Sequence, residues 1–505
     1  MSNFTLIARN TALLYIRSFF VLLISLYTSR VVISVLGIED FGIFNVVGGV
    51  ISMISFVNTS LLASYQRYYN VVMAEENINS LRIWFRSSLS SQLLLAIIIV
   101  VISETLGVWF LNTQLVIPDN RIEAANWIYQ ASVVTIVFTI FEVPYSAMVT
   151  AYEKMNVFAI ISVLDAVLKL AIVFLLKVVS SDKLIVYSLL LMVISFLDLF
   201  LFYIYVEKKF DLGRFSLSWR WEKIKALTSF AGYTFIDLLS QTLKSSGINI
   251  LLNIFFGPVV NAARGLAFQV LGATNQFVKS FQMSFQPQLI RSYADKDYVY
   301  LNNLFFASSK FSYYLILLIT VPIIVETSQI LHLWLGDNVP EHTVSFVRLI
   351  LFTSWVSCFA NPTSVIIYAT GKMRKFTAYV SGLNLAIVPV AYLFLKLGCE
   401  PESTMIVSLA ITILAQAVRF YILRGMVDIP VVKYLKGVLF PSLLVTLLSF
   451  TVPLFLHNIS ITNTIFFITI CFISCLWTAI IIFLCGVNKQ ERKLITEKIW
   501  SVIKK

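Results

Sequence analysis

Long apolar stretches and short polar segments alternate along this whole chain. Each of fourteen stretches is mostly apolar and about as long as the 20 residues that an α-helix needs to cross a bilayer. They lie near residues 11–36, 41–63, 88–111, 125–151, 157–177, 184–206, 226–256, 260–285, 305–332, 343–369, 376–397, 404–427, 435–456 and 463–486. The pattern predicts an all-α integral membrane protein with about fourteen transmembrane helices.

Composition supports the same class. Hydrophobic residues make up 59% of the 505 residues and charged residues 13%, whereas an ordinary soluble domain carries about 25% charge. The polar connections are too short to hold a catalytic domain, and no carboxylate pair, nucleophile–base set or phosphate-binding glycine motif stands out. Cys471 and Cys475 lie four residues apart without further ligands nearby. We therefore expect no enzyme activity, no cofactor and no metal site.

The positive charges predict the orientation. If the N-terminus is cytoplasmic and the helices alternate, most of the 38 Lys and Arg residues fall in cytoplasmic segments. The external segments then hold only Arg121, Lys177, Lys183 and Lys396. This bias places both termini in the cytoplasm. The net charge of +12 needs no nucleic-acid partner, because basic cytoplasmic loops face anionic lipid.

One segment of the chain occurs twice. The residues from Phe141 to Phe158 share Phe, Pro, Ser, Ala, Lys and Met positions with the residues from Phe359 to Phe376, at a constant offset of 218. Gly37 and Gly257, which should each close a helix, lie 220 residues apart. Such a repeat is typical of transporters with a substrate site between two similar halves.

The repeat predicts the domain organisation. Helices 1–6 map onto helices 7–12, and an even number of helices gives a pseudo-twofold axis along the membrane normal. We expect an N-terminal six-helix lobe at 1–206, a cytoplasmic linker at 207–225, a second six-helix lobe at 226–427, and two additional helices with a basic tail at 428–505.

Charges inside the apolar stretches are candidates for function, since each costs roughly 2.5–3.5 kcal/mol at the bilayer centre. The cations are Arg17, Arg30, Lys169, Lys244, Arg264, Lys279 and Arg348, and the acids are Glu104, Glu142, Asp165, Asp198, Asp237 and Glu326. Helices 1, 7 and 8 hold five of the cations and one acid. Positive charge therefore collects on the first helices of the two halves.

Each charge also has a structural interpretation. Arg17, Arg30 and Arg264 lie near helix ends, where their side chains can snorkel to the membrane surface. Asp165 and Lys169 are an i, i+4 pair that neutralises itself. Lys244 lies near the middle of its helix and is the hardest cation to explain structurally. Asp237 either pairs with Lys244, two turns away, or carries a coupling proton.

Dense amides and hydroxyls accompany these cations. Helix 7 carries them from Asp237 to Asn249, including Gln241, and helix 2 carries Asn58. Single residues of this kind join helices, but a whole stripe with an embedded Lys suits a hydrophilic, anionic ligand.

The run from Arg30 to Gly49, RVVISVLGIEDFGIFNVVGG, resembles the first hairpin of Wzx-type polysaccharide exporters of the multidrug/oligosaccharidyl-lipid/polysaccharide (MOP) exporter superfamily. The GKMR stretch at 371–374 and Gln286-Pro287 fit the same family. The resemblance implies two six-helix lobes in a V shape that rock between inward- and outward-open states. It implies a flippase in the bacterial inner membrane that moves an undecaprenyl-diphosphate-linked oligosaccharide, an O-antigen, capsule or exopolysaccharide unit, to the periplasmic leaflet.

The candidate residues follow from both arguments. For the diphosphate and glycan they are Arg17, Arg30, Lys244, Arg264, Lys279, Gln241 and Asn58, and for ion coupling they are Asp237, Asp165 and Glu142. The expected partners are the lipid-linked oligosaccharide, membrane lipids, H⁺ or Na⁺ as coupling ion, and the polymerase and glycosyltransferases of the same pathway.

Two related functions stay open. A multidrug/cation antiporter of the same superfamily would favour acidic cavity residues, whereas cations dominate here. A lipid II flippase handles a similarly anionic head group and is not excluded by the sequence. A non-transporting scaffold would have no reason to hold charges at membrane depth.

Overall fold

The computed structural model describes residues 3–52, 56–74, 77–152, 154–210, 216–230, 232–370, 373–458, 464–488 and 491–492. These residues form helices and connections and no β-strand. The chain is all-α, as predicted. Ten described helices are long and apolar enough to cross a membrane, and an eleventh candidate span is a pair bent by 118° at Gly37. The predicted stretches near 226–256 and 260–285 are also helical but are more polar and incompletely described.

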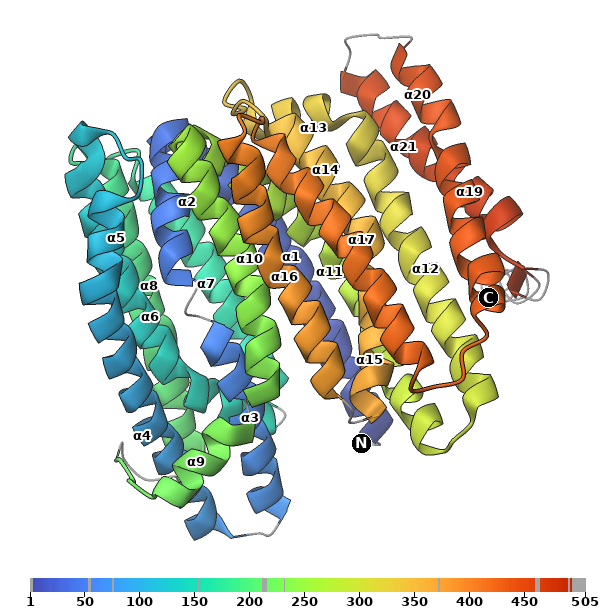
Figure 1. Ribbon diagram of the computed structural model, residues 1–505. Helices are drawn as coiled ribbons and strands as arrows, with labels where there is room; N and C mark the ends of the chain where they lie inside the picture. The colour runs from blue at the N-terminus through green and yellow to red at the C-terminus, as the bar shows by residue number, and fades with distance from the viewer. Residues whose placement is uncertain are drawn as a thin grey trace. The chain divides into compact units, whose positions relative to one another are not determined.

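Contacts divide the chain into two compact units, and Figure 1 labels the helices of both. Unit 1 comprises Met1–Gly265 and Val388–Pro401, and unit 2 comprises Leu266–Ile387 and Glu402–Lys505. These boundaries follow packing density rather than internal symmetry. The six-plus-six division drawn from the repeat therefore stays a prediction.

Unit 1 contains the first eleven α-helices, of which the last continues into unit 2. They are α1 (Asn3–Leu36), α2 (Ile38–Ser52), α3 (Phe56–Ala74), α4 (Ile78–Ile102), α5 (Val108–Thr113), α6 (Ile122–Ala151), α7 (Met155–Leu175), α8 (Lys183–Lys209), α9 (Trp221–Phe230), α10 (Gly232–Phe256) and α11 (Pro258–Ala294). Helix α6 packs against α2, α3, α4 and α8. Its buried alanines, including Ala125 and Ala147, allow these helices to approach closely.

Unit 2 is built around α12 (Tyr298–Val325), which packs against α14 and α21. The other helices are α13 (Thr327–Leu335), α14 (Thr343–Ser357), α15 (Ala360–Thr370), α16 (Met373–Lys396), α17 (Glu402–Arg424), α18 (Val431–Tyr434), α19 (Phe440–Ser449), α20 (Thr451–Asn458) and α21 (Thr464–Ile481). The part of α16 from Val388 onward belongs to unit 1. The two additional C-terminal helices predicted from the sequence correspond to α19 with α20 and to α21, and they pack on α12. Lys310 of α12, only 6% exposed at its side chain, pairs with Glu491 just after them at 2.6 Å.

The glycines that mark the repeat do close helices. Gly37, after α1, and Gly257, after α10, have φ angles of 87° and 78°. Each donates its N–H to a carbonyl four residues back, at 2.8 Å. Only glycine enters this left-handed region without strain. The same helix-closing turn therefore stands at both glycines that the sequence repeat pairs.

The longer repeated segment differs between its copies. The first copy begins inside the continuous helix α6, which contains Pro144, and ends in the first turns of α7. In the second copy the helix is interrupted between α14, which ends at Ser357, and α15, which begins at Ala360. Pro362 lies at the start of α15, where a missing N–H costs no intrahelical hydrogen bond.

A half-buried ion triad holds three segments of unit 1 together. Arg121 donates to Asp40 of α2 through Nε at 2.8 Å and Nη2 at 2.5 Å, and to Asp182, which caps α8, through Nη1 at 2.5 Å. Burial tends to raise the pKa of Asp182, but hydrogen bonds from Arg121 and from the Ile185 and Leu184 N–H groups hold that pKa below its usual 3.8.

We expect Arg121→Gln to lower the free energy of unfolding by about 1.5–3 kcal/mol, because two carboxylates lose a charged donor. The depressed pKa of Asp182 means that its stabilisation is present above the unfolded pKa and is lost as the pH falls through the folded value. Thermal melting of purified protein between pH 7 and pH 3 measures both effects. Lys177→Gln, at an exposed position, should leave the melting curve unchanged; equal melting of both variants would refute the triad's contribution.

Candidate functional site

A row of polar side chains runs along α10. Gln241, Ser245 and Asn249 are spaced by four residues, so they share one face of the helix, and Lys244 lies beside them. Gln241 is exposed, Lys244 and Ser245 are half-buried, and Asn249 is buried. We call these four residues the α10 row. Exposure thus rises along the row from Asn249 toward Gln241.

Arg264 of α11 joins the α10 row at its buried end. Its side chain is buried, with a residue exposure of 6%. The guanidinium donates to the Ser245 carbonyl at 2.8 Å and to Asn249 Oδ1 at 3.4 Å. The side-chain amide of Asn261 donates to the Asn249 carbonyl at 2.7 Å. Arg264 therefore does not snorkel to a membrane surface but is built into the packing of α10 on α11.

Helix α2 closes the other side of this network. The Asn249 side chain donates to the Asn45 carbonyl of α2 at 3.2 Å. Gly42 of α2 lies so close to Pro258 that an added Cβ would stand 2.0 Å from the Pro258 carbonyl oxygen. The hairpin motif singled out in the sequence thus places α2 directly against α10 and α11.

The remaining candidates for ligand binding are not all brought to this network. Arg30 of α1 and Lys279 of α11 are exposed, and Lys279 belongs to unit 2. Asn58 of α3 is half-buried, and its Oδ1 is a buried atom without a hydrogen-bond partner among the described residues. The side chains of Arg17 and Asp237 lie outside the described part of the chain, so the predicted Asp237–Lys244 pair is not tested.

A second polar cluster lies between α6, α7 and α8. The predicted pair of Asp165 and Lys169 forms, with Nζ 2.8 Å from Oδ1. Asp198 of α8 lies close enough to Asp165 for the two carboxyl groups to share a hydrogen bond, and Glu142 of α6 interacts with both. The carboxyl group of Asp198 thus lies beside the Asp165–Lys169 ion pair, and Glu142 adds a third acid to the cluster.

Asp198 is not among the candidate residues that the sequence predicts for ion coupling. It was recognised as an intramembrane acid, yet nothing in its own helix suggested a partner. Its Oδ1 is a buried atom with no hydrogen-bond partner among the described residues. The available signal was that helices 4, 5 and 6 each carry one acid near mid-membrane, which three adjacent helices can bring together.

Comparisons with known proteins identify the fold. No protein-family model and no curated protein matches the sequence. The structure is similar to an inward closed conformation of the lipid II flippase MurJ, with a TM-score of 0.71, 11% identity, and coverage of 93% of this chain and 98% of that one. It is also similar to an inward-facing multidrug resistance MATE family transporter of the MOP superfamily, with a TM-score of 0.68, 14% identity, and coverage of 80% and 94%.

A third similar structure is a MOP superfamily transporter from Pyrococcus furiosus, whose description reports a reversed polarity of the binding pocket. The TM-score is 0.57, the identity 15%, and the coverage 83% of this chain and 95% of that one. At these identities the likeness concerns the fold. The chain therefore has the multi-helix fold that the MurJ flippase and the MATE transporters of the MOP superfamily share.

Proposed function

We propose that this protein is a transporter that flips an undecaprenyl-diphosphate-linked oligosaccharide across a bacterial inner membrane by alternating access. The observation that carries the proposal is the α10 row, in which Lys244 stands among amides and hydroxyls within a transporter fold. A diphosphate needs fixed cations at membrane depth, and a glycan needs hydrogen-bonding side chains. The lipid tail stays in the bilayer while the head group crosses.

Roles within the site follow from burial. Lys244 and Gln241 have exposed or half-buried side chains and are proposed to contact the diphosphate and the glycan. Arg264 is buried and its guanidinium already donates a hydrogen bond to the Ser245 carbonyl. We therefore assign Arg264 to positioning the α10 row. Four further ligand contacts proposed from the sequence are kept, and we propose that the substrate reaches them in other steps of the transport cycle. They are Arg17, Arg30, Lys279 and Asn58.

Ion coupling is assigned to the carboxyl cluster of Glu142, Asp165 and Asp198, with Asp237 as a further candidate. Acids gathered at membrane depth can bind a proton or a cation and can change their occupancy when a lobe rearranges. The energy of an H⁺ or Na⁺ gradient would enter the transport cycle there.

Replacing Asp198 with Asn tests this coupling. The amide can still donate a hydrogen bond to Asp165 but cannot titrate, so we expect the acceleration of transport by an imposed pH or Na⁺ gradient to disappear. Proteoliposomes with and without each gradient measure it. Glu104→Gln, which removes an exposed carboxylate elsewhere in unit 1, is the matched control. Gradient-driven acceleration in Asp198→Asn equal to the wild type would contradict the assignment.

Two observations favour a lipid-linked substrate over a cationic drug. The charge beside the amides of the α10 row is positive, which attracts phosphate and repels an organic cation. The MurJ structure also matches 93% of this chain, against 80% and 83% for the other two transporters. Lipid II remains the second candidate because its flippase has the same fold and the α10 row offers no discrimination between diphosphate-linked glycans.

Proteoliposomes containing a polyprenyl-diphosphate oligosaccharide test the function directly. A glycosidase added outside should digest the glycan progressively when the protein is present and only its initial outer fraction when it is absent. Parallel vesicles carry lipid II or a fluorescent cationic dye. Movement of the oligosaccharide lipid supports the proposal, movement of lipid II alone supports the second candidate, and movement of the dye alone overturns both.

A further inference from the structure

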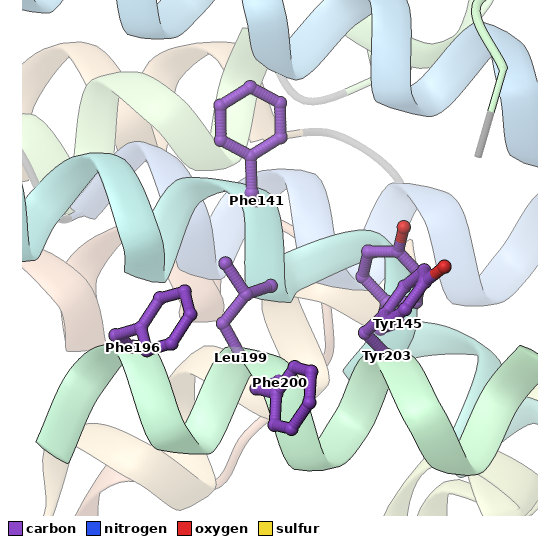
Figure 2. Close-up of a pocket in the computed structure, with 6 residues that line it drawn as sticks. All are labelled: Phe141, Tyr145, Phe196, Leu199, Phe200 and Tyr203. Carbon is purple, nitrogen blue, oxygen red and sulfur yellow. The ribbon is translucent and has the colours of Figure 1, made fainter.

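An apolar groove between α6 and α8 belongs to the lipid-facing surface of unit 1 (Figure 2). Both helices are long and apolar enough to cross a membrane, and Phe196 and Phe200 at the groove are 46% and 44% exposed. Large apolar side chains exposed on such helices face lipid. The residues that line the groove are Phe141, Tyr145, Phe196, Leu199, Phe200 and Tyr203.

The tyrosine end of this groove shows where the lipid-facing surface stops. The Tyr145 and Tyr203 rings meet edge to face, with their centroids 5.7 Å apart. One turn further along the same face of α8 stands Glu207, a carboxylate that interacts with Tyr145. Tyrosine is enriched at membrane surfaces and a carboxylate favours water. Tyr145 also contacts Phe85 of α4, with ring centroids 5.3 Å apart, so the membrane surface crosses α4 near Phe85.

Helix α9 begins just inside this level. The Ser218 N–H, shortly before α9, donates to Ser90 Oγ of α4 at 2.9 Å. Ser90 lies five residues along α4 from Phe85, or about 7.5 Å. Near the other end of α9, the Ser64 hydroxyl of α3 donates to the Leu227 carbonyl at 2.7 Å. Helix α9 therefore runs from α4 to α3 at the depth where the membrane meets water.

The apolar face of α9 is turned to the protein, but two indole rings are not. Ile224 and Leu227 are 5% and 0% exposed. Trp219, just before the helix, and Trp221 are 48% and 64% exposed, and their ring centroids lie 6.5 Å apart. Lys225, four residues after Trp221, is exposed on the same face of the helix. The outer face of α9 thus presents an aromatic pair with a cation beside it.

The other charges near α9 divide between the two faces. The Lys223 ammonium lies 4.0 Å from the centroid of the Trp84 ring on α4, so it belongs to the packing of α9 on the protein. Arg220 and Glu222 are exposed. The outer face therefore carries the cations Arg220 and Lys225 against the single acid Glu222, which suits contact with lipid phosphates.

We propose that the outer face of α9 rests on the lipid head-group layer of the membrane. The rings of Trp219 and Trp221 enter the boundary between head groups and acyl chains, where the ring surface is shielded from water and the indole N–H still finds an acceptor. Arg220 and Lys225 contact lipid phosphates. The charge distribution of the sequence predicts that this is the cytoplasmic leaflet.

This contact ties the connection between α8 and α10 to the membrane surface, because α9 is part of that connection. The contact is separate from the α10 row and does not depend on which substrate the protein transports. Two other surroundings fit α9 less well. Water alone would leave both indoles solvated at a depth where lipid begins. A second copy of the chain would find a helix of only 10 residues, whereas stable protein interfaces bury roughly 1,200–2,000 Å².

Photo-cross-linking of the full-length protein in phospholipid vesicles tests the contact. The photoreactive residue p-benzoylphenylalanine replaces Trp221, Phe196 or Ile78, one position at a time. Phe196 is the lipid-facing control, and Ile78, 44% exposed at the first residue of α4, is the control on the water side of Phe85. After illumination, we expect Trp221 and Phe196 to give lipid adducts in several-fold higher yield than Ile78, measured by intact mass.

Fragmentation of the lipid adducts gives the depth. We expect attachment to the glycerol or the first acyl carbons at Trp221, and farther along the acyl chain at Phe196. Three results would overturn the proposal. They are a lipid-adduct yield at Trp221 no higher than at Ile78, cross-linking of Trp221 to a second copy of the chain instead of lipid, and attachment at Trp221 as deep in the acyl chain as at Phe196.

Discussion

Lys244→Ala is expected to abolish glycan-lipid transport while the protein still inserts and folds. Removing one member of a desolvated charge contact costs about 2–5 kcal/mol, which corresponds to a loss of roughly 30-fold or more. The side chain is half-buried on α10, beside Ser245, which accepts hydrogen bonds from Arg264. The change therefore removes a cation from the α10 row, and the two hydrogen bonds from Arg264 to Ser245 do not involve the Lys244 side chain.

Lys244→Arg is the matched variant, since it keeps the charge and should retain a substantial part of the transport rate. The glycosidase-access assay in proteoliposomes gives the rate, and the melting temperature shows whether each variant is folded. Transport by Lys244→Ala at the wild-type rate would remove Lys244 from the site. Equal loss in the Ala and Arg variants would show that the ammonium geometry, and not charge alone, is needed.

Gly42→Ala is expected to have the largest effect on stability. The added Cβ would stand 2.0 Å from the carbonyl oxygen and 2.6 Å from the carbonyl carbon of Pro258. Both are backbone atoms at the start of α11, so no side-chain rotation relieves the contact, and α2 must move away from α11. We expect a loss of about 3 kcal/mol or more in the free energy of unfolding.

Gly48→Ala is the control because it lies on the same helix with open space around its Cβ. In a helix interior alanine is favoured over glycine by about 0.5–1 kcal/mol, so this variant should melt at the same temperature or slightly higher. Thermal melting in detergent compares the two. Equal melting temperatures would mean that α2 does not pack against Pro258 as closely as the structure places it.

Features that depend on neighbouring residues of one helix could be predicted from the sequence. The length and apolarity of each stretch predicted the helical membrane fold, because backbone groups in hydrocarbon must be hydrogen-bonded within a helix. The Asp165–Lys169 pair was predicted from its spacing of four and is present at 2.8 Å. The closing glycines at 37 and 257 were predicted from their position after an apolar run, and both have positive φ.

Contacts between helices that are distant in the sequence could not be predicted. Asp198 is 33 residues from Asp165, so no spacing rule relates the two, yet the packing of α7 on α8 puts their carboxyl groups together. Snorkelling was an open alternative for Arg264, and the structure instead buries it against Ser245 and Asn249. The interruption between α14 and α15 was also not predicted. The corresponding residues before the first copy of the repeat lie inside the continuous helix α6.

The sequence by itself determined the all-α membrane class, the closing glycines, the local ion pair and the row of polar residues on α10, because each depends on helical periodicity and on the cost of exposing polar groups to lipid. Only the tertiary structure decided that Asp198 joins the acidic cluster, that Arg264 supports the α10 row, and that α6 and α8 form a groove. These features depend on the rotation and depth at which one helix packs against another. Side-chain interlocking over the whole interface sets that rotation and depth, and no single stretch of sequence encodes it.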